Sequence, residues 1–561
     1  MRILIVGGYG TFGGRIVELL DREAAFTLIV AGRSMASART FCAGRGATAA
    51  QLQPARFDRD GDLGAQLETF SPDIVIDASG PFQEYGEGAC RLVSACIAAR
   101  IHYLDLADGS AFVEGVSAHD AAARQAGVYA LSGVSSFPVL TAAVVRRLAG
   151  SLVRVDEISG GIAPSPFAGV GANVIRAIAG YAGQPVAYLG RTAKIIGRPF
   201  TQQRRYTIAP PGRLPLRNTL FSLVDVPDLR ALSAVWPQAR RVWMGAGPAP
   251  EILHRALIFC AWLVRMGIVR TLAPLAPLMH WATNRLRWGE HRGGMFVEVK
   301  GADAEGAAQT RSWHLLAEGA DGPLIPSMAV QAIVLKHLAG APPRAGARAC
   351  VDDLELEDYE RLFASRTIYT GFRQAVRPGA LLYERILGDA WQVLPQAIRT
   401  MHDGVASAEG RGRVDRGRSP LAWLVGALMS FPPAGADLPV RVVFEQTPGG
   451  EVWRRTFGRH SFQSHQYDGR GKSERLIVER FGALEFAMAL VVEDRRVRLV
   501  TRRWSAFGVA LPMWLGPRAN AHETVENGCF RFFVEISHPL TGLIVRYDGW
   551  LMPQPPGGRA E

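Results

Sequence analysis

The sequence predicts three successive domains of different class: an α/β domain with a doubly wound parallel sheet, an α+β domain and a mainly antiparallel β domain. Apolar strands alternate with helical segments over the first 135 residues, which is typical of the first class. A glycine-rich loop directly follows the first of these strands. Segments with period-two alternation fill the last third of the 561 residues, which is typical of antiparallel structure.

The first domain is expected over residues 1–135. Its strands are apolar along their length, which indicates a parallel sheet with helices on both faces. Between them lie segments with apolar residues at helical spacing. The expected strands are RILIV (2–6), FTLIVAG (26–32), ATAAQLQ (47–53), SPDIVIDASG (71–80), HYLDLAD (102–108) and VYALSG (128–133), and the expected helices are FGGRIVELLDR (12–22), a segment from Ser34, EGACRLVSACIAARI (87–101) and AHDAAARQAG (118–127).

The stretch VGGYGTFGG (6–14) joins the first strand to the first helix and has G-x-G-x-x-G spacing. In this position Gly8 allows a tight turn, Gly10 lets the backbone approach a pyrophosphate, and Gly13 lets the helix pack close to the sheet. The helix N-terminus offers free N–H groups to the phosphates. The sequence therefore predicts a Rossmann domain that binds a dinucleotide, and the alternative is a purely structural turn. The expected contacts of this loop are Gly8, Tyr9, Gly10, Thr11, Phe12 and Gly13.

The end of the second strand decides between NAD and NADP. An NAD site usually has an acidic residue there, which binds the ribose 2′-hydroxyl. Here Arg33 and Ser34 follow the strand, and no acidic residue occurs between Glu23 and Asp58. Because a guanidinium pairs well with a 2′-phosphate, the sequence favours NADP over NAD. Asp58, after the third strand, is expected to accept a hydrogen bond from the adenine amino group.

The turn after the fourth strand, Ser79, Gly80, Pro81 and Phe82, is expected at the carboxyl edge of the sheet, where doubly wound folds bind ligands. Gly80 permits close approach of the backbone, and Phe82 is expected beside the nicotinamide ring. A loop shaped only by Gly-Pro is the alternative.

The proton donor for hydride transfer is open among several residues near this edge, which include Tyr103 and Asp108. The candidates are Asp105, Tyr85 and His102. Asp105 is preferred because it lies nearer the expected crevice. His102 titrates near neutral pH, but it begins its strand. Each of these residues also has a structural interpretation, such as a buried carboxylate that accepts bonds from backbone amides.

Further motifs follow the glycine loop. They are Gly80-Pro81-Phe82, Tyr85-Gly86, Ala95-Cys96, the strand HYLDL (102–106), LSGVSSFPVLTAAV (131–144) and the segment 311–350. This pattern resembles the saccharopine dehydrogenase-like oxidoreductases over residues 1–370, with a poorly matched middle. The resemblance implies a Rossmann domain, a second α+β domain and NAD(P)-dependent redox chemistry, but not saccharopine as the substrate. Asp108-Gly109 departs from the Gly-Glu usual in that family.

The α+β domain is expected over residues 136–372, as a substrate and dimerisation domain, so a homodimer is one expected assembly. Its apolar segments around 251–282 are too short to span a bilayer, and Arg255 and Arg265 bracket the first of them. They predict either two buried helices or an interfacial pair with arginines at the headgroups. The second interpretation suggests a lipid-like substrate and a peripheral position at the inner membrane face.

The C-terminal domain is expected over residues 380–555, with an amphipathic helix at 382–402. The expected strands are VRVVFEQ (440–446), EVWRRTFG (451–458), RLIVERFG (475–482), LEFAMALVVE (484–493), RVRLVTRRWSAFG (496–508), CFRFFVEISH (529–538) and LIVRYDGWL (543–551). Pro448-Gly449-Gly450 indicates a hairpin turn. The region resembles an uncharacterised bacterial domain often fused behind this type of oxidoreductase. Its alternation suggests a curled sheet or small barrel that could enclose an apolar ligand, or a structural or dimerising module.

Composition narrows the function. The net charge of +12 favours acidic partners such as phosphorylated cofactors, but arginines form no basic-aromatic stripe, so no nucleic-acid partner is expected. The six cysteines have no C-x-x-C spacing, so neither a metal site nor a disulfide framework is predicted and a cytoplasmic chain is expected. The leading hypothesis is an NADP-dependent oxidoreductase that transfers hydride to or from a carbonyl, imine or enoyl group. The alternative is a non-catalytic NADP-binding or lipid-binding scaffold or carrier.

Overall fold

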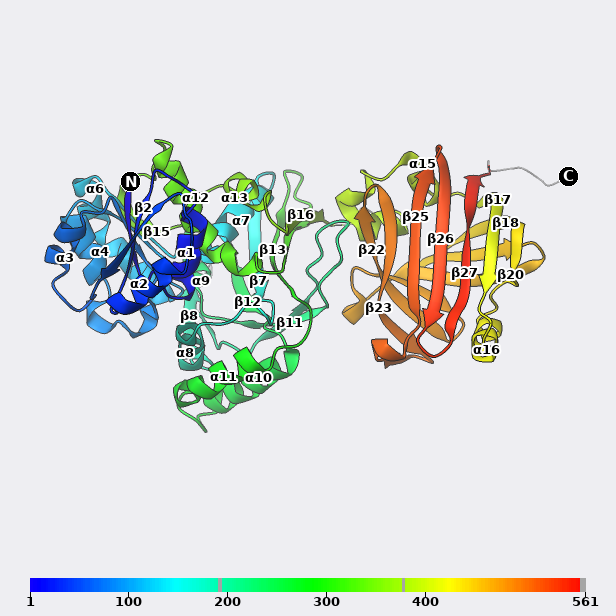
Figure 1. Cartoon of the computed structure of the whole chain (residues 1–561), viewed down its shortest axis with the longest axis horizontal. Coiled ribbons are helices and arrows are strands. Elements are labelled where there is room, and N and C mark those ends of the chain that lie inside the picture. Colours follow the sequence, from blue (N-terminus) through cyan, green and yellow to red (C-terminus); the bar gives the residue numbers. More distant parts are fainter. Residues whose placement is uncertain (190–193, 376–378, 555–561) are drawn as a thin grey trace. The chain divides into compact units, whose positions relative to one another are not determined.

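The computed structural model describes residues 1–189, 194–375 and 379–554. The chain forms two compact units (Figure 1). The first contains Met1–Tyr206 and Thr219–Thr370, and the second contains Thr207–Asn218 and Gly371–Glu561. The two sheets of the first unit carry the predicted α/β and α+β domains, and the second unit carries the predicted β domain.

The first sheet is parallel and has seven strands in the order β15-β6-β5-β4-β1-β2-β3. Six of these strands were predicted from the sequence, and the structure confirms them. The seventh, β15, was not predicted as a strand; it pairs with β6, although more than 200 residues separate the two in the chain. The strands are β1 (Arg2–Val6), β2 (Thr27–Gly32), β3 (Gln51–Arg56), β4 (Ile74–Asp77), β5 (His102–Asp105), β6 (Tyr129–Ser132) and β15 (Gly346–Ala349).

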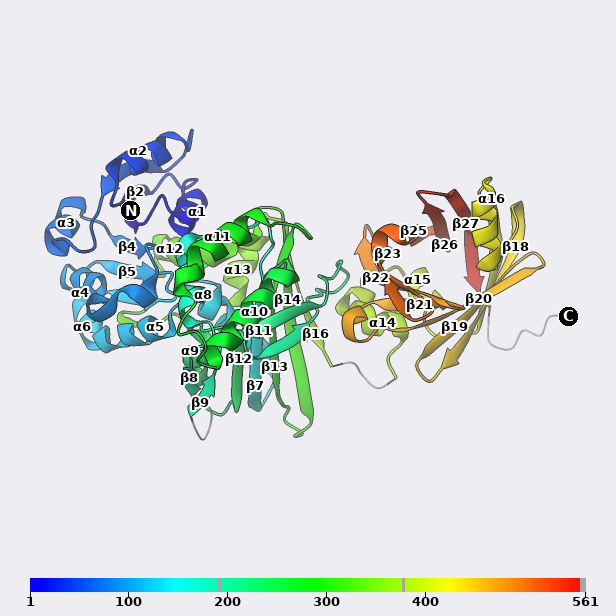
Figure 2. The same ribbon diagram turned by 90° about the horizontal axis from the view of Figure 1, so that it is seen from below.

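Helices pack around this sheet, as Figures 1 and 2 show. Helix α12 packs on α1, and the Gln331 side chain donates to the Leu19 carbonyl at 2.9 Å. The helices are α1 (Thr11–Leu20), α2 (Met35–Ala43), α3 (Leu63–Phe70), α4 (Arg91–Ala98), α5 (Ser110–Val116), α6 (Asp120–Ala126) and α12 (Ile325–Leu338). Helix α7 (Thr141–Ala149) packs instead on the second sheet, and α13 (Leu356–Phe363) packs on α7 and α12. The predicted doubly wound class of the first domain is therefore confirmed.

The second sheet is mixed, with the order β10-β11-β12-β7-β13-β14-β16, and it confirms the α+β class. Strands β12 and β7 run parallel, while β7, β13 and β14 form long antiparallel pairs. The strands are β7 (Arg154–Ala163), β10 (Gln203–Tyr206), β11 (Thr219–Leu223), β12 (Arg241–Ala246), β13 (Arg292–Ala302), β14 (Ala308–Glu318) and β16 (Ile368–Gln374), with a separate pair β8 (Val186–Leu189) and β9 (Lys194–Gly197).

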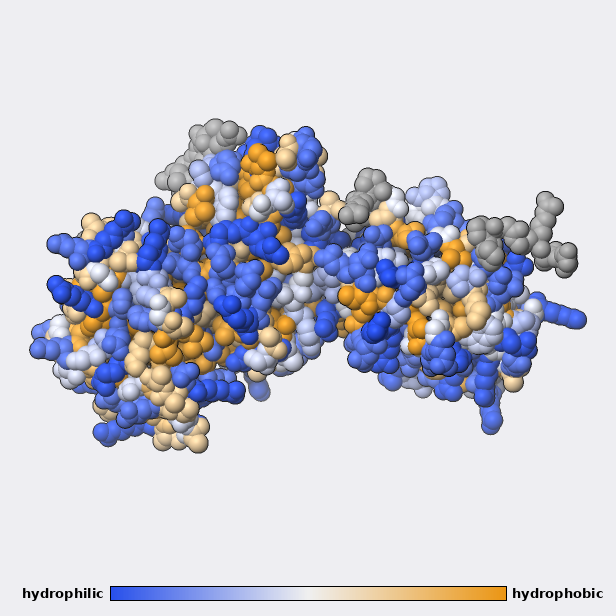
Figure 3. Space-filling view, turned by 90° about the horizontal axis from the view of Figure 1, so that it is seen from above, coloured by the Kyte–Doolittle hydropathy of each residue, from blue (hydrophilic) through white to orange (hydrophobic). Residues whose placement is uncertain are grey.

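Four further helices accompany the second sheet, and Figure 2 shows α10 and α11 in front of it. They are α8 (Ala172–Tyr181), α9 (Asp228–Val235), α10 (Glu251–Arg265) and α11 (Ala276–Arg285). Within the described residues, no helix is long and apolar enough to cross a membrane. On the face shown in Figure 3, hydrophilic side chains are spread over the surface, with apolar patches between them.

The second unit is a closed antiparallel barrel. Its eleven-stranded sheet has the order β22-β21-β20-β19-β18-β17-β27-β26-β25-β23-β24, and the additional pairing of β22 with β23 closes the ring. The strands are β17 (Ser407–Arg416), β18 (Gly435–Thr447), β19 (Gly450–Phe457), β20 (His460–Asp468), β21 (Ile477–Phe481), β22 (Leu484–Glu493), β23 (Arg496–Ala506), β24 (Val509–Leu511), β25 (Arg518–Glu526), β26 (Cys529–His538) and β27 (Gly542–Pro553).

The barrel differs from expectation at two places. Strands β17, β20, β24 and β25 were not predicted. Strand β24 has only three residues, and in the other three small or polar residues occupy inward positions where an apolar run would have marked a strand. The predicted single helix 382–402 is wrong: it is divided into α14 (Leu382–Leu387) and α15 (Gln396–Met401). Gly388, with a φ of +59°, ends the first helix, and Pro395 precedes the second. The hairpin turn after β18 is confirmed, since Thr447 pairs with Gly450.

Candidate cofactor site and active site

The glycine loop brings the N-terminus of α1 close to the end of β1. Gly7 has a φ of +77°, a left-handed conformation that favours glycine. A Cβ on Gly13 would lie 2.2 Å from the Gly7 carbonyl oxygen, and one on Gly8 would lie 2.9 Å from the Ile5 carbonyl oxygen. Both positions therefore require glycine for packing. Gly10 is exposed directly before α1, and a Cβ there would lie 3.0 Å from the Gly7 carbonyl oxygen, so glycine also leaves this backbone open to a ligand.

The polar residues expected around the adenosine follow β2 and β3, at the edge of the sheet where this loop follows β1. Arg33 is exposed directly after β2, and Asp58 follows β3. The Tyr9 hydroxyl accepts a hydrogen bond from the Ser34 backbone N–H at 3.0 Å, which holds the Tyr9 ring over Gly32. The Ser34 hydroxyl accepts from the Ser37 N–H at 3.2 Å and caps α2. A second helix N-terminus therefore lies next to Arg33, where a 2′-phosphate would bind.

A buried polar network occupies the end of β4. Asp77 is fully buried, pairs with the Arg59 guanidinium and accepts from the Ser79 hydroxyl at 2.5 Å. The Tyr85 hydroxyl lies 2.9 Å from that of Ser79, and Arg59 stacks over the Tyr85 ring at 3.8 Å. Burial, reinforced by Asp77, raises the pKa of Tyr85, so its hydroxyl stays protonated. Sequence reasoning missed Arg59 because it lies in an ordinary loop after β3.

The turn after β4 is held by the second domain. Asn173, on α8, donates to the Gly80 carbonyl at 2.8 Å. Phe82 is buried against Tyr85 and Phe112, with ring centroids 5.3 and 4.9 Å apart. Pro81 links Gly80 to Phe82. The turn is therefore positioned by contacts on both sides of the crevice.

Asp105 lies inside the protein at the end of β5. Its carboxylate accepts from the Gly133 N–H at 2.8 Å, the Ala107 N–H at 2.9 Å and the Ser132 hydroxyl at 3.0 Å. Burial raises the pKa of Asp105 to about 7, although these hydrogen bonds oppose the shift. The carboxylate therefore ties β5 to the segment after β6.

His102 lies at the opposite edge of the sheet from the glycine loop, because it begins β5 and the loop follows the end of β1. Its ring stacks on Tyr129 at 4.1 Å, and its Nδ1 accepts from the Tyr129 N–H at 3.2 Å. Burial lowers the pKa of His102 to about 4, and His337 adds to the shift. His102 is therefore a neutral side chain, separated by the length of the strand from the edge that carries the loop.

A cavity of about 570 Å³ begins at α1 and extends beneath α8, α10 and α11. Thr11, Phe12 and Arg15 contribute its wall on the cofactor side. Most of the remaining wall is apolar and comes from β7, β13 and these three helices. The cavity therefore adjoins the dinucleotide loop and suits an apolar molecule.

Two carboxyl groups, Asp108 and Asp225, line this cavity. Asp108 accepts from the Gln83 amide at 2.9 Å, and Asp225 accepts from the Ser110 hydroxyl at 2.6 Å. Burial raises the pKa of both groups, and the charge of Asp225 raises that of Asp108 further. Sequence reasoning missed Asp225 because the middle of the chain contains no motif that marks it. In the described part of the chain, no group of three His, Cys, Asp or Glu side chains could hold a metal ion.

Two regions match known families. Residues 3–131 match the saccharopine dehydrogenase NADP binding domain, and residues 394–551 match a domain of unknown function, DUF4166. A search of curated proteins finds no match to the chain. The resemblance inferred from the sequence is thereby confirmed for both regions.

Two solved structures illustrate the matches found by structural comparison. Apo saccharopine dehydrogenase (L-Glu forming) from Saccharomyces cerevisiae is 13% identical and covers 67% of this chain and 100% of its own, with a TM-score of 0.47. Biliverdin reductase from Synechocystis sp. PCC 6803, solved with biliverdin and NADP+, is 12% identical and covers 64% of this chain and 94% of its own, with a TM-score of 0.29.

The parallel sheet, the glycine loop and the match at residues 3–131 define the class of the protein as an NAD(P)-dependent oxidoreductase. Its N-terminal domain is of the saccharopine dehydrogenase NADP-binding type, which confirms NADP as the expected cofactor, and its C-terminal barrel carries the DUF4166 domain. The loop supplies free N–H groups for the phosphates, and the bound nicotinamide supplies hydride chemistry.

Arg33→Asp is expected to shift the preference from NADPH toward NADH by about 2 kcal/mol, roughly 30-fold, because a charge-assisted pair is replaced by repulsion. The ratio of the two dissociation constants, measured by nicotinamide fluorescence, checks this. Arg39→Asp is the matched control, since Arg39 is exposed on α2 and should leave the ratio unchanged. An unchanged ratio in Arg33→Asp would assign the 2′-phosphate to another group.

Proposed function

We propose that this oxidoreductase transfers hydride between NADP(H) and a carbonyl, imine or enoyl carbon of an apolar, lipid-like substrate. The observation that carries the proposal is the cavity of about 570 Å³, which begins at the helix of the dinucleotide loop and is mostly apolar. A substrate in it would place its reactive carbon on the α1 side. Its apolar body would lie among α8, α10 and α11.

We assign the proton donor to Asp108. Reduction of a carbonyl needs a hydride on carbon and a proton on oxygen, and the chain must supply the proton. Asp108 lines the cavity, and its raised pKa favours the protonated form. The Coulomb interaction with Asp225 also raises the pKa of Asp108. Asp108 would give its proton to the substrate oxygen and recover one from solvent.

NADPH-dependent reduction should accelerate with the length of an apolar substrate. In series of methyl ketones, enoates and imines of about 4 to 12 carbons, kcat/KM should rise about fourfold per methylene, from ~0.8 kcal/mol each, until the cavity is filled. NADPH oxidation at 340 nm measures this. Val174→Trp narrows the cavity and should stop the increase at shorter chains. NADPH binding without turnover on any series would instead favour the non-catalytic NADP-binding scaffold.

The pH profile tests the proton donor. Carbonyl reduction requires the enzyme form in which Asp108 is protonated. We therefore expect kcat/KM for this reaction to be highest at low pH and to fall as pH rises through the raised pKa of Asp108. Asp108→Asn should lower kcat/KM about 100-fold and remove this inflection. Asp225→Asn should move the inflection to lower pH, since it removes the charge that raises the pKa. A profile that Asp108→Asn leaves unchanged would contradict the assignment.

We also propose that α10 and α11 contact a membrane surface from which the substrate enters. Ile252, Phe259 and Trp262 are exposed along one face of α10, at spacings of seven and three residues, and Met266, directly after the helix, is exposed as well. The other face of α10 lines the cavity, and Leu278 on α11 both lines it and is 59% exposed. Five arginines lie within or next to this helix pair in the sequence, at positions 255, 265, 270, 285 and 287. This arrangement is typical of an interfacial helix pair.

Flotation with vesicles that contain anionic lipid checks this contact. The wild-type chain should float with the vesicles, and more salt should weaken the association. Phe259→Glu combined with Trp281→Glu should reduce the bound fraction about tenfold, since both side chains are exposed on the pair. Val153→Glu is the control, an exposed apolar residue before β7. Absence of wild-type flotation, or equal loss in both variants, would contradict a peripheral membrane role.

A further inference from the structure

We propose that the C-terminal barrel is a second ligand site, which encloses one uncharged amphiphile: a long apolar body that ends in a hydroxyl or carbonyl oxygen. The inference concerns the second unit alone and does not depend on the reaction proposed for the first. It rests on an interior cavity, on the chemistry of its wall and on the difference between the two ends of the barrel.

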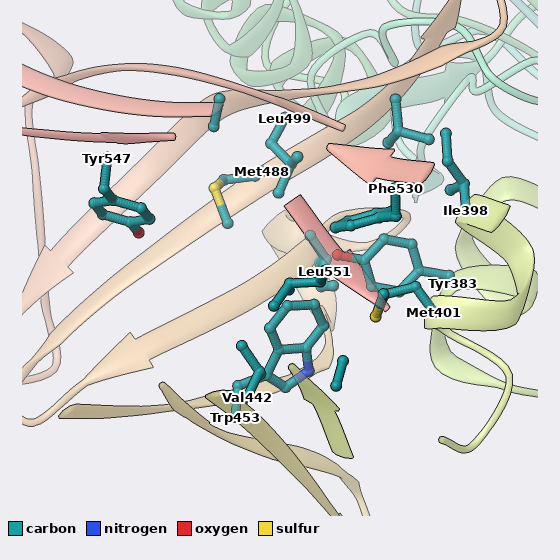
Figure 4. Close-up of a cluster of buried hydrophobic side chains, with 14 of the residues drawn as sticks. Tyr383, Ile398, Met401, Val442, Trp453, Met488, Leu499, Phe530, Tyr547 and Leu551 are labelled. Atoms are coloured by element: carbon teal, nitrogen blue, oxygen red, sulfur yellow. The ribbon is translucent and has the colours of Figure 1, made fainter. Parts of the chain in front are cut away.

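The barrel encloses a cavity of about 450 Å³. This volume lies within the range of sites that hold one small molecule. Figure 4 shows side chains from α14 and α15 facing side chains from the strands around the interior, among them Tyr383, Met401, Met488, Leu499 and Tyr547. Most of the wall is apolar, so an apolar body would gain by leaving water.

One wall of the cavity carries polar groups. The Arg455 guanidinium donates to the Glu479 carboxylate at 2.9 Å and to the Ser464 hydroxyl at 2.7 Å, and Ser464 donates to Glu479 at 2.6 Å. Opposite charges therefore cancel within the wall. A second pair, His402 and Glu523, lies 2.7 Å apart and is also buried. Because the arginine already has a carboxylate partner, a ligand carboxylate would be left without a cation, and an uncharged head fits better.

Four residues that line the cavity carry buried polar atoms without a hydrogen-bond partner among the described residues. Three can donate: the Trp453 indole N–H and the hydroxyls of Tyr383 and Thr501. The fourth, the Gln466 amide oxygen, can only accept. Buried polar groups normally have hydrogen-bond partners, so this set indicates a ligand that carries an oxygen-containing group rather than a pure hydrocarbon. A hydroxyl both donates and accepts and could therefore partner either kind of group.

The two ends of the barrel differ. Antiparallel order places the start of β19 and the end of β20 at the same end as α14 and α15, whose apolar side chains join the core and close that end. The opposite end holds α16 (Pro420–Leu428) and the 3-10 turn Met513–Leu515. Figure 1 shows α15 and α16 at opposite ends of the strands.

The α16 end exposes large apolar side chains. Trp514 is 75% exposed and Trp423 is 66% exposed. Leu421 and Leu515 are exposed and also line the cavity, so apolar surface continues from the interior to solvent. The α16 end is therefore the entrance for an apolar molecule, and Gln466, near the helix-covered end of β20, lies deep inside. The ligand would enter with its polar oxygen first.

Displacement of the uncharged fluorophore N-phenyl-1-naphthylamine from the full-length chain tests the proposal. Ala521 faces the cavity from β25, so Ala521→Trp should weaken fluorophore binding at least tenfold. Asn520→Trp, on the exposed face of the same strand, should bind as wild type does, which controls for folding of the strand. Val174→Trp, which narrows the cavity of the first unit, should leave this binding intact.

Competition then identifies the ligand chemistry. Oleyl alcohol should displace the fluorophore at least tenfold better than octadecane or oleate at pH 8, and Gln466→Leu should reduce this advantage over octadecane. Two outcomes would overturn the barrel site. One is that the fluorophore does not bind to the wild-type chain, and the other is that binding is lost in Val174→Trp but kept in Ala521→Trp. Tighter binding of oleate would overturn the uncharged head. NADPH affinity should be unchanged in Ala521→Trp, so failure of this proposal is distinguishable from failure of the proposed reaction.

Discussion

The close contact between helix α1 and the end of β1 is the constraint on which the first unit depends. Gly13 lies so near the Gly7 carbonyl that even one added carbon would overlap it, at 2.2 Å. The contact directs the free N–H groups of α1 toward the crevice at the carboxyl edge of the sheet. It also makes the first turns of α1 part of the cavity wall through Thr11, Phe12 and Arg15. One helix therefore connects the dinucleotide site with the substrate cavity.

The second domain builds the remainder of that cavity. The mixed sheet provides a floor through β7 and β13, and α8, α10 and α11 cover it. Asn173 on α8 holds the turn after β4 from the other side of the crevice. As a result, Asp108 from the first sheet and Asp225 from the second domain face one apolar space, where burial raises the pKa of both. The general acid that we propose at Asp108 therefore depends on both domains.

The structure of the C-terminal barrel depends on a different physical constraint, the closure of its sheet. Closure through β22 and β23 removes the strand edges of the ring, but it leaves an interior too wide for side chains alone to fill. Inside it, Arg455 and Glu479 form a pair of opposite charges, which limits the cost of burying them. An interior of this composition is selective for uncharged molecules rather than for anions.

Local pattern was sufficient to predict much of this protein. The six apolar strands, the glycine loop after β1, Arg33 after β2 and the hairpin at residues 448–450 each depend on a few neighbouring residues. Period-two alternation likewise predicted most strands of the barrel. It missed the three-residue strand β24, and it missed β17, β20 and β25, whose inward positions include glycine, alanine, serine and glutamine rather than a continuous apolar set.

The sequence by itself determined the domain classes, the dinucleotide loop and the nature of its cofactor, because these follow from spacing along the chain. Only the tertiary structure decided which side chains share a site. It joined β15 to the first sheet, brought Asp225 to the cavity of Asp108, placed His102 at the edge away from the loop and closed the barrel. Such contacts link residues far apart in sequence, and packing selects them from many partners with equally suitable local patterns.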